Sequence, residues 1–137
     1  MIGYQKCDLN ATEPMRQTEG AAGYDLCACE SVLLMPGSIR MVDTGIVIEI
    51  PPNWYGKIES RSSLALRGLV TLGGVIDSDY RGTVRCILHN VSGESFEVRV
   101  GFRIAQIIFQ SFEAPQFLET EKLSETDRGL GGFGSTN

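Results

Sequence analysis

The chain has 137 residues, a formal net charge of −5 and a hydrophobic fraction of 42%, values that fit one globular domain with a real core. The negative charge gives no long-range attraction to a polynucleotide or an anionic membrane, so we expect neither as a partner. No apolar run reaches the roughly 18 residues that span a bilayer, and the N-terminus lacks a signal-peptide pattern. We therefore expect a soluble intracellular protein of the cytoplasm or nucleus, with a viral origin open.

The cysteines and the single histidine exclude two classes of site. Cys7, Cys27, Cys29 and Cys86 form no C-x-x-C pair, and His89 is the only histidine. This pattern argues against a zinc site and predicts four free thiols. A serine hydrolase is equally disfavoured, because there is no G-x-S-x-G motif and His89 would be the only imidazole base.

Short β-rich runs separated by turn residues follow one another along most of the chain, which predicts an all-β sandwich or barrel rather than alternating βα units. One short helix is expected at residues 62–67, opened by serines that can cap it and closed by Gly68. The predicted strands are Tyr24–Ala28, Val32–Leu34, Ile39–Val42, Gly45–Ile50, Trp54–Glu59, Leu69–Leu72, Thr83–Asn90, Phe96–Val100 and Ile104–Phe109.

The stretch from Gly73 to Gly82 concentrates unusual chemistry between two predicted strands. It carries Asp77, Asp79 and Tyr80 between glycines that permit sharp turns and close approach of a ligand. We expect a β-hairpin with a polar, reactive tip. The alternative is an ordinary turn, in which Asp and Gly are common.

Three further polar clusters interrupt the apolar pattern. The predicted helix opens with Arg61, Ser62 and Ser63. These residues form either an anion-binding site or an ordinary helix cap. Asp25 lies at the start of an otherwise apolar strand, where it is either a site residue or only a turn aspartate. The run Arg103–Gln106 places polar side chains in a buried-looking strand, where they need partners. Each cluster alone is a weak indication of function.

After Phe117 the composition shifts to Glu, Ser, Thr and Gly. We therefore divide the chain into a β domain, residues 1–120, and a flexible glycine-rich arm, residues 121–137. The arm spells G-x-G-x-x-G, but a dinucleotide fold needs a strand before this motif and a long helix after it. Two readings remain, a disordered terminus or an arm whose Arg128 and Phe133 grip a phosphate and a flat ring.

Taken in order, five stretches resemble the five motifs of the trimeric dUTP pyrophosphatases, or dUTPases. The resemblance runs from about Pro14 to the end of the chain. It implies a jelly-roll-like β fold, Mg²⁺ as cofactor, a homotrimer with active sites at subunit interfaces, and hydrolysis of dUTP to dUMP and pyrophosphate. This reaction limits uracil incorporation into DNA and supplies dUMP for thymidylate synthesis. The five stretches are Ala22–Leu26, Arg61–Ala65, Gly74–Gly82, Arg103–Gln106 and Arg128–Thr136.

The resemblance also implies roles for single residues. Asp77 would be the base that activates water for in-line attack on the α-phosphorus, and Gln106 would position that water. Tyr80 would lie against the deoxyribose and exclude a 2′-hydroxyl. Asp25 would act on the metal through water, since Mg²⁺ would be held mainly by the triphosphate.

The remaining implied residues bind the substrate. The hairpin backbone would read the uracil edge, because fixed N–H and C=O groups leave cytosine unpaired. Phe133 of the arm would cap the base and Arg128 would bind the γ-phosphate. The other phosphate contacts would come from Arg61, Ser62, Ser63, Gly134, Ser135 and Thr136, and the uracil contacts from Thr71, Gly74, Val75 and Ile76.

Two alternatives stay open. The family usually has glycine where this chain has Ser63, and Arg-Ser-Ser is similar to the dCTP deaminases, which share the fold. Those enzymes carry a glutamate ten residues after the hairpin aspartate, where this chain has Ile87. The second alternative is a non-catalytic dUTPase-like binding or regulatory protein, which the presence of Asp77, Gln106 and Arg128 argues against.

Overall fold

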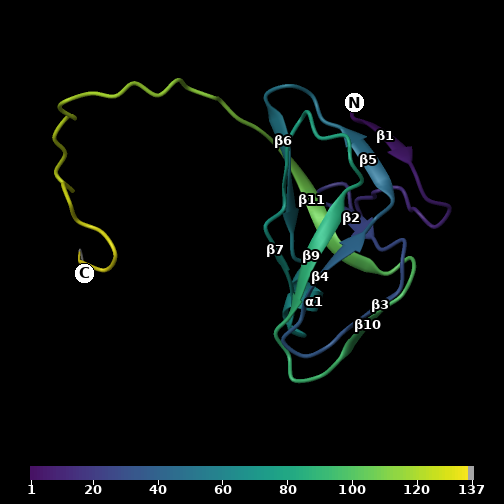
Figure 1. Cartoon of the computed structure of the whole chain (residues 1–137). Coiled ribbons are helices and arrows are strands. Elements are labelled where there is room, and N and C mark those ends of the chain that lie inside the picture. The colour runs from purple at the N-terminus through teal and green to yellow at the C-terminus, as the bar shows by residue number, and fades with distance from the viewer. Residues whose placement is uncertain (136–137) are drawn as a thin grey trace.

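The computed structural model describes residues 1–135 and consists almost entirely of strands. Over these residues the one helix is short, so the all-β prediction is confirmed. The elements are β1 (Gly3–Lys6), β2 (Tyr24–Cys27), β3 (Val32–Leu34), β4 (Ile39–Asp43), β5 (Ile46–Glu49), β6 (Trp54–Glu59), α1 (Ser62–Ala65), β7 (Leu69–Leu72), β8 (Val75–Ile76), β9 (Arg85–Asn90), β10 (Phe96–Val98) and β11 (Arg103–Ser111). Figure 1 shows their arrangement.

Two larger sheets enclose a common apolar core. One has the order β2-β11-β6-β8 and the other β4-β9-β7, while β1-β5 and β10-β3 form two-stranded ribbons. Side chains alternate between the two faces of a strand, as in β9, where Cys86, Leu88 and Asn90 are buried while Arg85 and Ile87 are exposed. Both larger sheets contribute to one cluster of buried side chains, among them Leu26, Ile58 and Ile107 from the first and Val42, Leu69 and Leu88 from the second.

The predicted hairpin exists, but its tip is more than a turn. β7 pairs with β9, with Leu72 opposite Ile87. Between them the chain leaves this sheet, and β8 pairs with β6 of the other sheet. Gly73 and Gly74 have φ angles of +63° and +98°, which let the backbone change sheets. The exposed polar residues Asp77, Asp79 and Tyr80 therefore follow a short strand of the other sheet instead of directly joining β7 to β9.

Two strands are absent from the predicted set, and the cap of the helix differs from the prediction. Strand β1 has four exposed residues and so carries no burial pattern, and strand β8 has only two residues. Helix α1 ends at Ala65, and its N-cap residue is Arg61, with no side-chain hydrogen bond to cap it. The prediction that serines cap this helix is wrong, because Ser62 and Ser63 lie within its first turn. Gly68 closes the turn with a φ of +88°.

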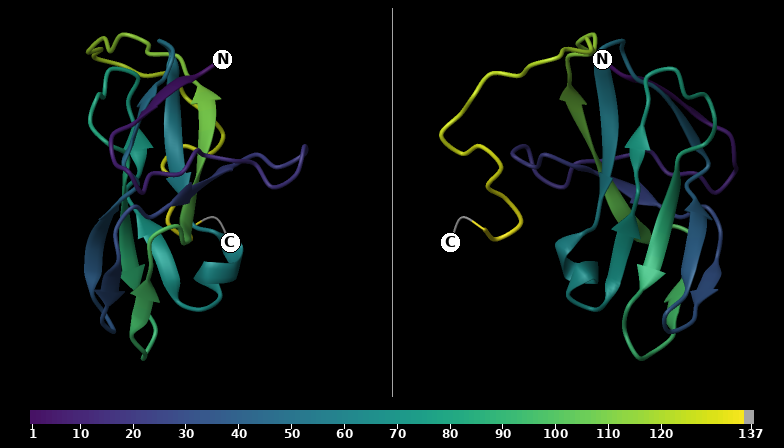
Figure 2. Two further views of the ribbon diagram at one scale, coloured as in Figure 1. Left: turned by 90° about the vertical axis from the view of Figure 1, so that its right-hand side faces the viewer. Right: turned by 60° about the vertical axis from the view of Figure 1, so that its left-hand side comes forward.

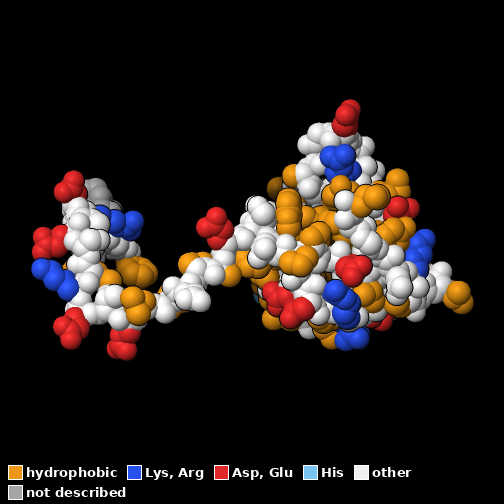
Figure 3. All heavy atoms as spheres, turned by 90° about the horizontal axis from the view of Figure 1, so that it is seen from above, with side chains coloured by type: hydrophobic (Ala, Val, Ile, Leu, Met, Phe, Trp, Pro, Cys, Tyr) orange, Lys and Arg blue, Asp and Glu red, His pale blue; other side chains and the backbone are white. Residues whose placement is uncertain are grey.

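The C-terminal arm runs away from the β body after β11. Figures 1 and 2 show it as a long yellow loop, and Figure 3 shows it standing apart from the body. Its apolar side chains are exposed, with Leu123 at 81% and Leu130 at 105%. The hydrogen bonds within residues 126–135 are local turns, such as Gly131 N to Arg128 O at 3.0 Å. The division at residue 120 stays a prediction.

Two sequence expectations concern the chain as a whole. Within residues 1–135, no helix has the length and apolar character needed to cross a membrane. The prediction of four free thiols is confirmed, since Cys7, Cys27, Cys29 and Cys86 are unpaired with one another.

Candidate active site

One cross-strand row of polar side chains lies on the outer face of the four-stranded sheet. Gln106 of β11 lies opposite Asp25 of β2 and opposite Glu59 of β6. Directly opposed residues of antiparallel strands project from the same face. Their neighbours Leu26 and Ile58 are buried in the core, so the row Asp25, Gln106 and Glu59 faces outward.

Asp25 is held between two arginines. Its Oδ1 lies 3.5 Å from Arg61 Nε and its Oδ2 lies 3.2 Å from Arg103 Nη1. Arg61 Nη1 also donates to the Arg103 carbonyl oxygen at 3.0 Å. The side chains of Asp25 and Arg61 are only 13% and 22% exposed. Two guanidinium groups around one shielded carboxylate leave a net positive charge, which suits an anionic ligand.

Gln106 is oriented by a carbonyl and by a glycine. Its Nε2 donates to the Ser60 carbonyl oxygen at 3.1 Å. A Cβ atom at Gly23 would overlap Gln106 Oε1, so a side chain there would push the amide away. The lack of a side chain at Gly23 therefore leaves the space that the Gln106 amide oxygen occupies.

The glycine-rich segment after β7 lies beside this row. Thr71 N donates to Ser60 Oγ at 2.9 Å, and Ile58 N donates to Gly74 O at 2.8 Å. A Cβ atom at Gly74 would lie 3.0 Å from Ile58 O, and its φ is +98°, so only glycine fits. Val75 follows with 62% exposure. Thr71, Gly74 and Val75 are thus brought near Gln106.

Asp77 lies farther along the same sheet. The register of β6 and β8 pairs Gly56 with Ile76, so extending it by one residue puts Asp77 opposite Tyr55. Tyr55 is four residues from Glu59, the partner of Gln106, a separation of about 13 Å at the rise of a strand. A single chain does not bring the predicted base next to the predicted water-positioning amide.

Tyr80 is fixed within its own loop. Its hydroxyl donates to the Thr83 carbonyl oxygen at 2.9 Å, and a Cβ atom at Gly82 would overlap its ring. Arg81 Nη1 donates to the Ser78 carbonyl oxygen at 2.7 Å. The loop therefore presents a preset tyrosine, 41% exposed.

The predicted arm residues lie apart from the body. Arg128 Nε donates to the Gly131 carbonyl oxygen at 2.8 Å, and Ser135 Oγ accepts from Gly132 N at 2.8 Å. Phe133 is 114% exposed, so its ring does not pack against the rest of residues 1–135. Gly134 has a φ of +87°. Thr136, the last predicted contact, lies outside the described residues.

The sequence-predicted residues thus fall into three groups. The first comprises the Gln106 row and the segments that adjoin it in β7, β8 and α1, the second is the end of β8 with the loop after it, and the third is the arm. The groups are Asp25, Arg61, Ser62, Ser63, Thr71, Gly74, Val75 and Gln106; then Ile76, whose side chain packs against the core, Asp77 and Tyr80; then Arg128, Phe133, Gly134 and Ser135. Sequence reasoning missed Ser60, whose only indication was its place before Arg61.

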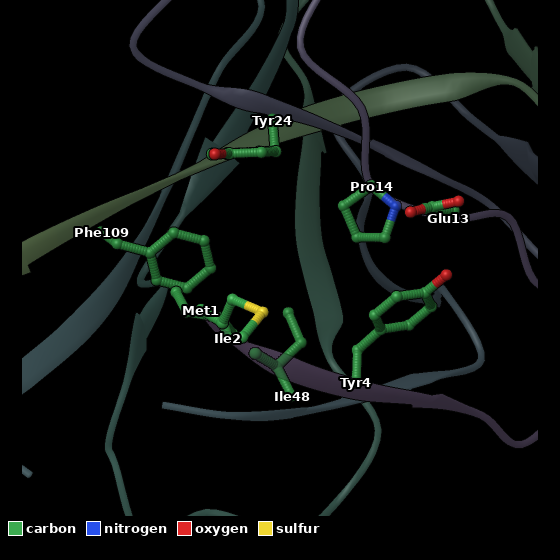
Figure 4. A pocket seen from close by; sticks show the side chains of 8 residues that line it. All are labelled: Met1, Ile2, Tyr4, Glu13, Pro14, Tyr24, Ile48 and Phe109. Atoms are coloured by element: carbon green, nitrogen blue, oxygen red, sulfur yellow. The ribbon is translucent and has the colours of Figure 1, made fainter. Parts of the chain in front are cut away.

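A separate cavity lies on the core side of β2. It has a volume of about 380 Å³, and Figure 4 shows its lining side chains. Tyr24 and Phe109 meet there edge to face at 5.9 Å between ring centroids. Tyr24 and Asp25 are consecutive in β2, so they point to opposite faces. The residues that line the cavity are Met1, Ile2, Tyr4, Glu13, Pro14, Tyr24, Ile48 and Phe109. None of them is a predicted site residue.

Within residues 1–135 no three His, Cys, Asp or Glu side chains converge on a metal position. Cys27 lies two residues after Asp25, and burial raises the pKa of its thiol above the usual value. The neutral thiol is therefore a poor ligand. Any metal at this face would depend on oxygen atoms brought by a ligand or by water.

An all-β body with this polar face and a glycine-flanked acidic loop belongs to the jelly-roll-like β fold class. The dUTPase family model matches residues 10–137. The chain is 44% identical over 138 residues to the Deoxyuridine 5′-triphosphate nucleotidohydrolase of Helicobacter pylori (strain Shi470), covering 98% of this chain and 95% of that protein. More particularly, the chain belongs to the dUTPase family.

Two further comparisons agree with this assignment. The protein of the same name from Cowpox virus (strain GRI-90 / Grishak) is 45% identical over 135 residues, covering 98% of this chain and 92% of that protein. The structure of the Staphylococcus bacteriophage 80alpha dUTPase with dUPNHPP has a TM-score of 0.95 at 25% identity, covering 100% of this chain and 98% of that chain.

Proposed function

We propose that this protein is a dUTP diphosphatase, which hydrolyses dUTP to dUMP and pyrophosphate. The observation that carries the proposal is the match along nearly the whole chain to relatives named for this activity. The solved phage dUTPase with a dUTP analogue supports the same substrate. The activity would limit uracil in DNA and supply dUMP for thymidylate synthesis. A location inside the cell remains a prediction.

We further infer a homotrimer with active sites at the subunit interfaces. Asp77 lies about 13 Å along the sheet from the row of Gln106, so one chain does not form a complete site. The arm leaves its own body with Arg128 and Phe133 exposed. Both features are explained if neighbouring copies bring the loop and the arm to the Gln106 group.

The outer face of β4-β9-β7 supports contact between copies. Its register puts six side chains in two neighbouring cross-strand rows: Met41, Ile87 and Leu72, then Ile39, His89 and Val70. Ile39 is 57% exposed and Met41 is 53% exposed. An apolar face of this kind marks an interaction surface, and we propose that other subunits cover it. Sedimentation should give three chains per particle; a monomer with full activity would contradict the trimer.

The roles of the first group follow from its charge and shape. Arg61 would contact the phosphates together with Ser62 and Ser63, and Arg103 would add its positive charge beside Asp25. The family uses Mg²⁺, which neutralises charge on the triphosphate when bound. Because both Asp25 oxygens already face arginines, this carboxylate fits a contact through metal-bound water better than direct ligation.

The hydrolytic step needs a base on one side of the α-phosphorus. Asp77 would take a proton from a water that Gln106 holds, and the oxygen of that water would attack the phosphorus in line. The bond to the bridging oxygen then breaks and pyrophosphate leaves. Asp77 is exposed at the end of β8, so it is accessible to a neighbouring subunit's site.

Recognition of the nucleoside would use the segment from Thr71 to Ile76 and the loop of Tyr80. The backbone of the segment is fixed by Ser60 and Ile58, and such fixed donors and acceptors suit uracil. The Tyr80 ring would lie against the deoxyribose. Phe133 would then cover the base, while Arg128, Gly134, Ser135 and Thr136 would enclose the phosphates.

The test is pyrophosphate release from dUTP in the presence of Mg²⁺, with dCTP and dTTP as controls. We expect rapid release from dUTP and almost none from the other two. No release from dUTP, with tight dUTP binding, would favour the non-catalytic alternative instead.

The deaminase alternative fails on one position. Ile87 stands where a deaminase carries glutamate, and it lies on the outward face of β9 opposite Met41 and Leu72. An aliphatic side chain cannot carry a proton during attack on the cytosine ring. We therefore expect no ammonia release from dCTP, measured alongside the pyrophosphate assay.

A further inference from the structure

Gly23 ends the loop before β2 and is buried. Its φ angle lies outside the left-handed region, so its backbone would accept a residue with a side chain. The obstacle is space, because a Cβ atom would overlap Gln106 Oε1 and lie 2.9 Å from Gln106 Cδ. The three atoms nearest to such a Cβ all belong to Gln106. The glycine therefore matters for the Gln106 amide rather than for its own backbone conformation.

The backbone of Gly23 is not the part that would move to make room. The next residue, Tyr24, pairs with Ile107 of β11. After it, Asp25 pairs with Gln106 itself. Moving Gly23 outward would strain these strand pairs, whereas the Gln106 amide is the end of a flexible side chain. A methyl group at residue 23 would therefore displace the amide and leave the strand in place.

The two ends of the Gln106 amide have different partners. Its Nε2 donates to the Ser60 carbonyl oxygen at 3.1 Å. Its Oε1 occupies the space beside Gly23, and no donor within residues 1–135 bonds to it. No side-chain oxygen in this part of the chain is both fully buried and without a partner. Oε1 is therefore open to solvent, where it can accept a hydrogen bond from a water.

We propose that Gly23 is a positioning residue for the hydrolytic step and acts through Gln106. The missing side chain lets the amide lie between Ser60 and the start of β2, with its oxygen available to the attacking water. Gly23 needs no contact with the water or the nucleotide for this role. The inference rests on the proposed function. Gly23, Ser60 and Gln106 belong to one chain, so their contacts do not depend on how the subunits are arranged.

Gly23→Ala should slow hydrolysis without weakening nucleotide binding. Gln106 Cδ lies 2.9 Å from the position of the new Cβ and must withdraw to an ordinary carbon contact of about 3.5–4.0 Å. Misplacing a positioning group by about 1 Å can lower a rate by about 10²-fold. Binding should change little, because the arginines and serines proposed to contact the phosphates are unaltered.

The experiment compares the parent with Gly23→Ala, Gln106→Ala, the double variant and the control Gly20→Ala. Gly20 is exposed in the same loop, and a Cβ atom there would meet nothing within 4 Å. The control thus removes a glycine without any contact with Gln106. The readouts are kcat and KM for dUTP, the Kd of a non-hydrolysable dUTP analogue by calorimetry, and the NMR signal of the Gln106 side-chain amide.

For Gly23→Ala we expect kcat to fall by about tenfold to hundredfold, with KM and the analogue Kd within about twofold. The Gln106 amide signal, identified as the one missing from Gln106→Ala, should shift. Gly20→Ala should match the parent in every readout. The double variant should be no slower than Gln106→Ala, because its methyl group has no amide to displace.

Three results would overturn the proposal. The first is a kcat of Gly23→Ala within twofold of the parent, or an equal fall in Gly20→Ala. The second is a loss of affinity with kcat unchanged. The third is a double variant in which the two losses multiply, since the methyl group would then act on something other than the Gln106 amide.

A failure of Gly23→Ala to fold would also decide the matter. Gln106→Ala deletes the two atoms nearest to the new Cβ, so the double variant should fold and have the turnover of Gln106→Ala. A double variant that also fails to fold would overturn the proposal. A parent that binds the analogue but does not split dUTP would refute the proposed function, while the Gln106 amide signal of Gly23→Ala would still decide the role of Gly23.

Discussion

The polar row of the β body and the C-terminal arm carry predicted site residues in opposite physical states. Around Gln106, the polar side chains are already engaged: Asp25 with two arginines, and Gln106 with Ser60. On the described part of the arm, the Phe133 side chain is fully exposed and the hydrogen bonds are local. The body is prepared before the ligand arrives, whereas the arm must gain its contacts from a ligand or another subunit. Activity should therefore respond differently to changes in the two regions.

The largest effect should come from the loop between β8 and β9. Asp77→Asn should leave dUTP binding largely intact and lower kcat by a factor on the order of 10² or more, because the amide cannot accept the proton of water. Asp79→Asn in the same loop is the matched control and should stay within a few-fold. Single-turnover kinetics would separate binding from chemistry, and normal turnover of Asp77→Asn would exclude it as the base.

Removal of Arg128 to Asn137 should have the next largest effect. The truncated chain should stay folded and trimeric, since the described part of this stretch, residues 128–135, has hydrogen bonds only among near neighbours in the chain. Turnover should fall by about tenfold to a hundredfold, because the site can no longer exclude water or align the triphosphate. Removal of Asn137 alone is the control. Full activity after the longer truncation would mean that the arm is only a disordered terminus.

A smaller and more specific effect should follow from changes at Tyr80. Tyr80→Ala should lower the preference for dUTP over UTP by about tenfold, because the ring that excludes a 2′-hydroxyl is gone. Tyr80→Phe keeps the ring and loses only the bond to the Thr83 carbonyl, so it should keep most of the preference. The ratio of kcat/KM for the two nucleotides measures both, and an unchanged ratio in Tyr80→Ala contradicts the assignment.

The sequence predicts the strands far better than the contacts of the site. Val32–Leu34, Trp54–Glu59 and Leu69–Leu72 have the predicted bounds, because alternation and turn residues are local properties. The pairing of Asp25 with Arg61 and Arg103 joins residues far apart in the chain, and nothing local indicates it. Ser62 and Ser63 were assigned to the cap on residue type, but the extended backbone of Arg61 takes that position.

The same limit applies to the sheet change at Gly73 and Gly74. Paired glycines indicate a turn, but they do not indicate which strand the chain pairs with after it. That partner is β6, which lies earlier in the chain. Asp77 is thereby moved to the far end of the outer face. The five motifs identify the family without revealing this separation, because it depends on which sheet the chain enters after the glycines.

The smallest perturbation tests the arm directly. Trp54 is the only tryptophan and is 42% exposed on β6, so a chain with Trp54→Phe and Phe133→Trp carries a single indole on the arm. Its emission should be that of a solvated indole, because residue 133 is exposed. Addition of the dUTP analogue dUpNHpp, the compound bound in the phage dUTPase structure, together with Mg²⁺ should change the emission, because the indole ring at position 133 then stacks on the uracil.

Addition of dUMP should change this emission much less, because dUMP lacks the phosphates that Arg128 would hold. Arg128→Ala in the same chain is the control, and it should abolish the response to dUpNHpp while leaving the spectrum without nucleotide unchanged. A response that survives Arg128→Ala would show that stacking alone orders the arm. Emission unchanged by dUpNHpp would contradict closure, and the body alone would then have to form the catalytic site.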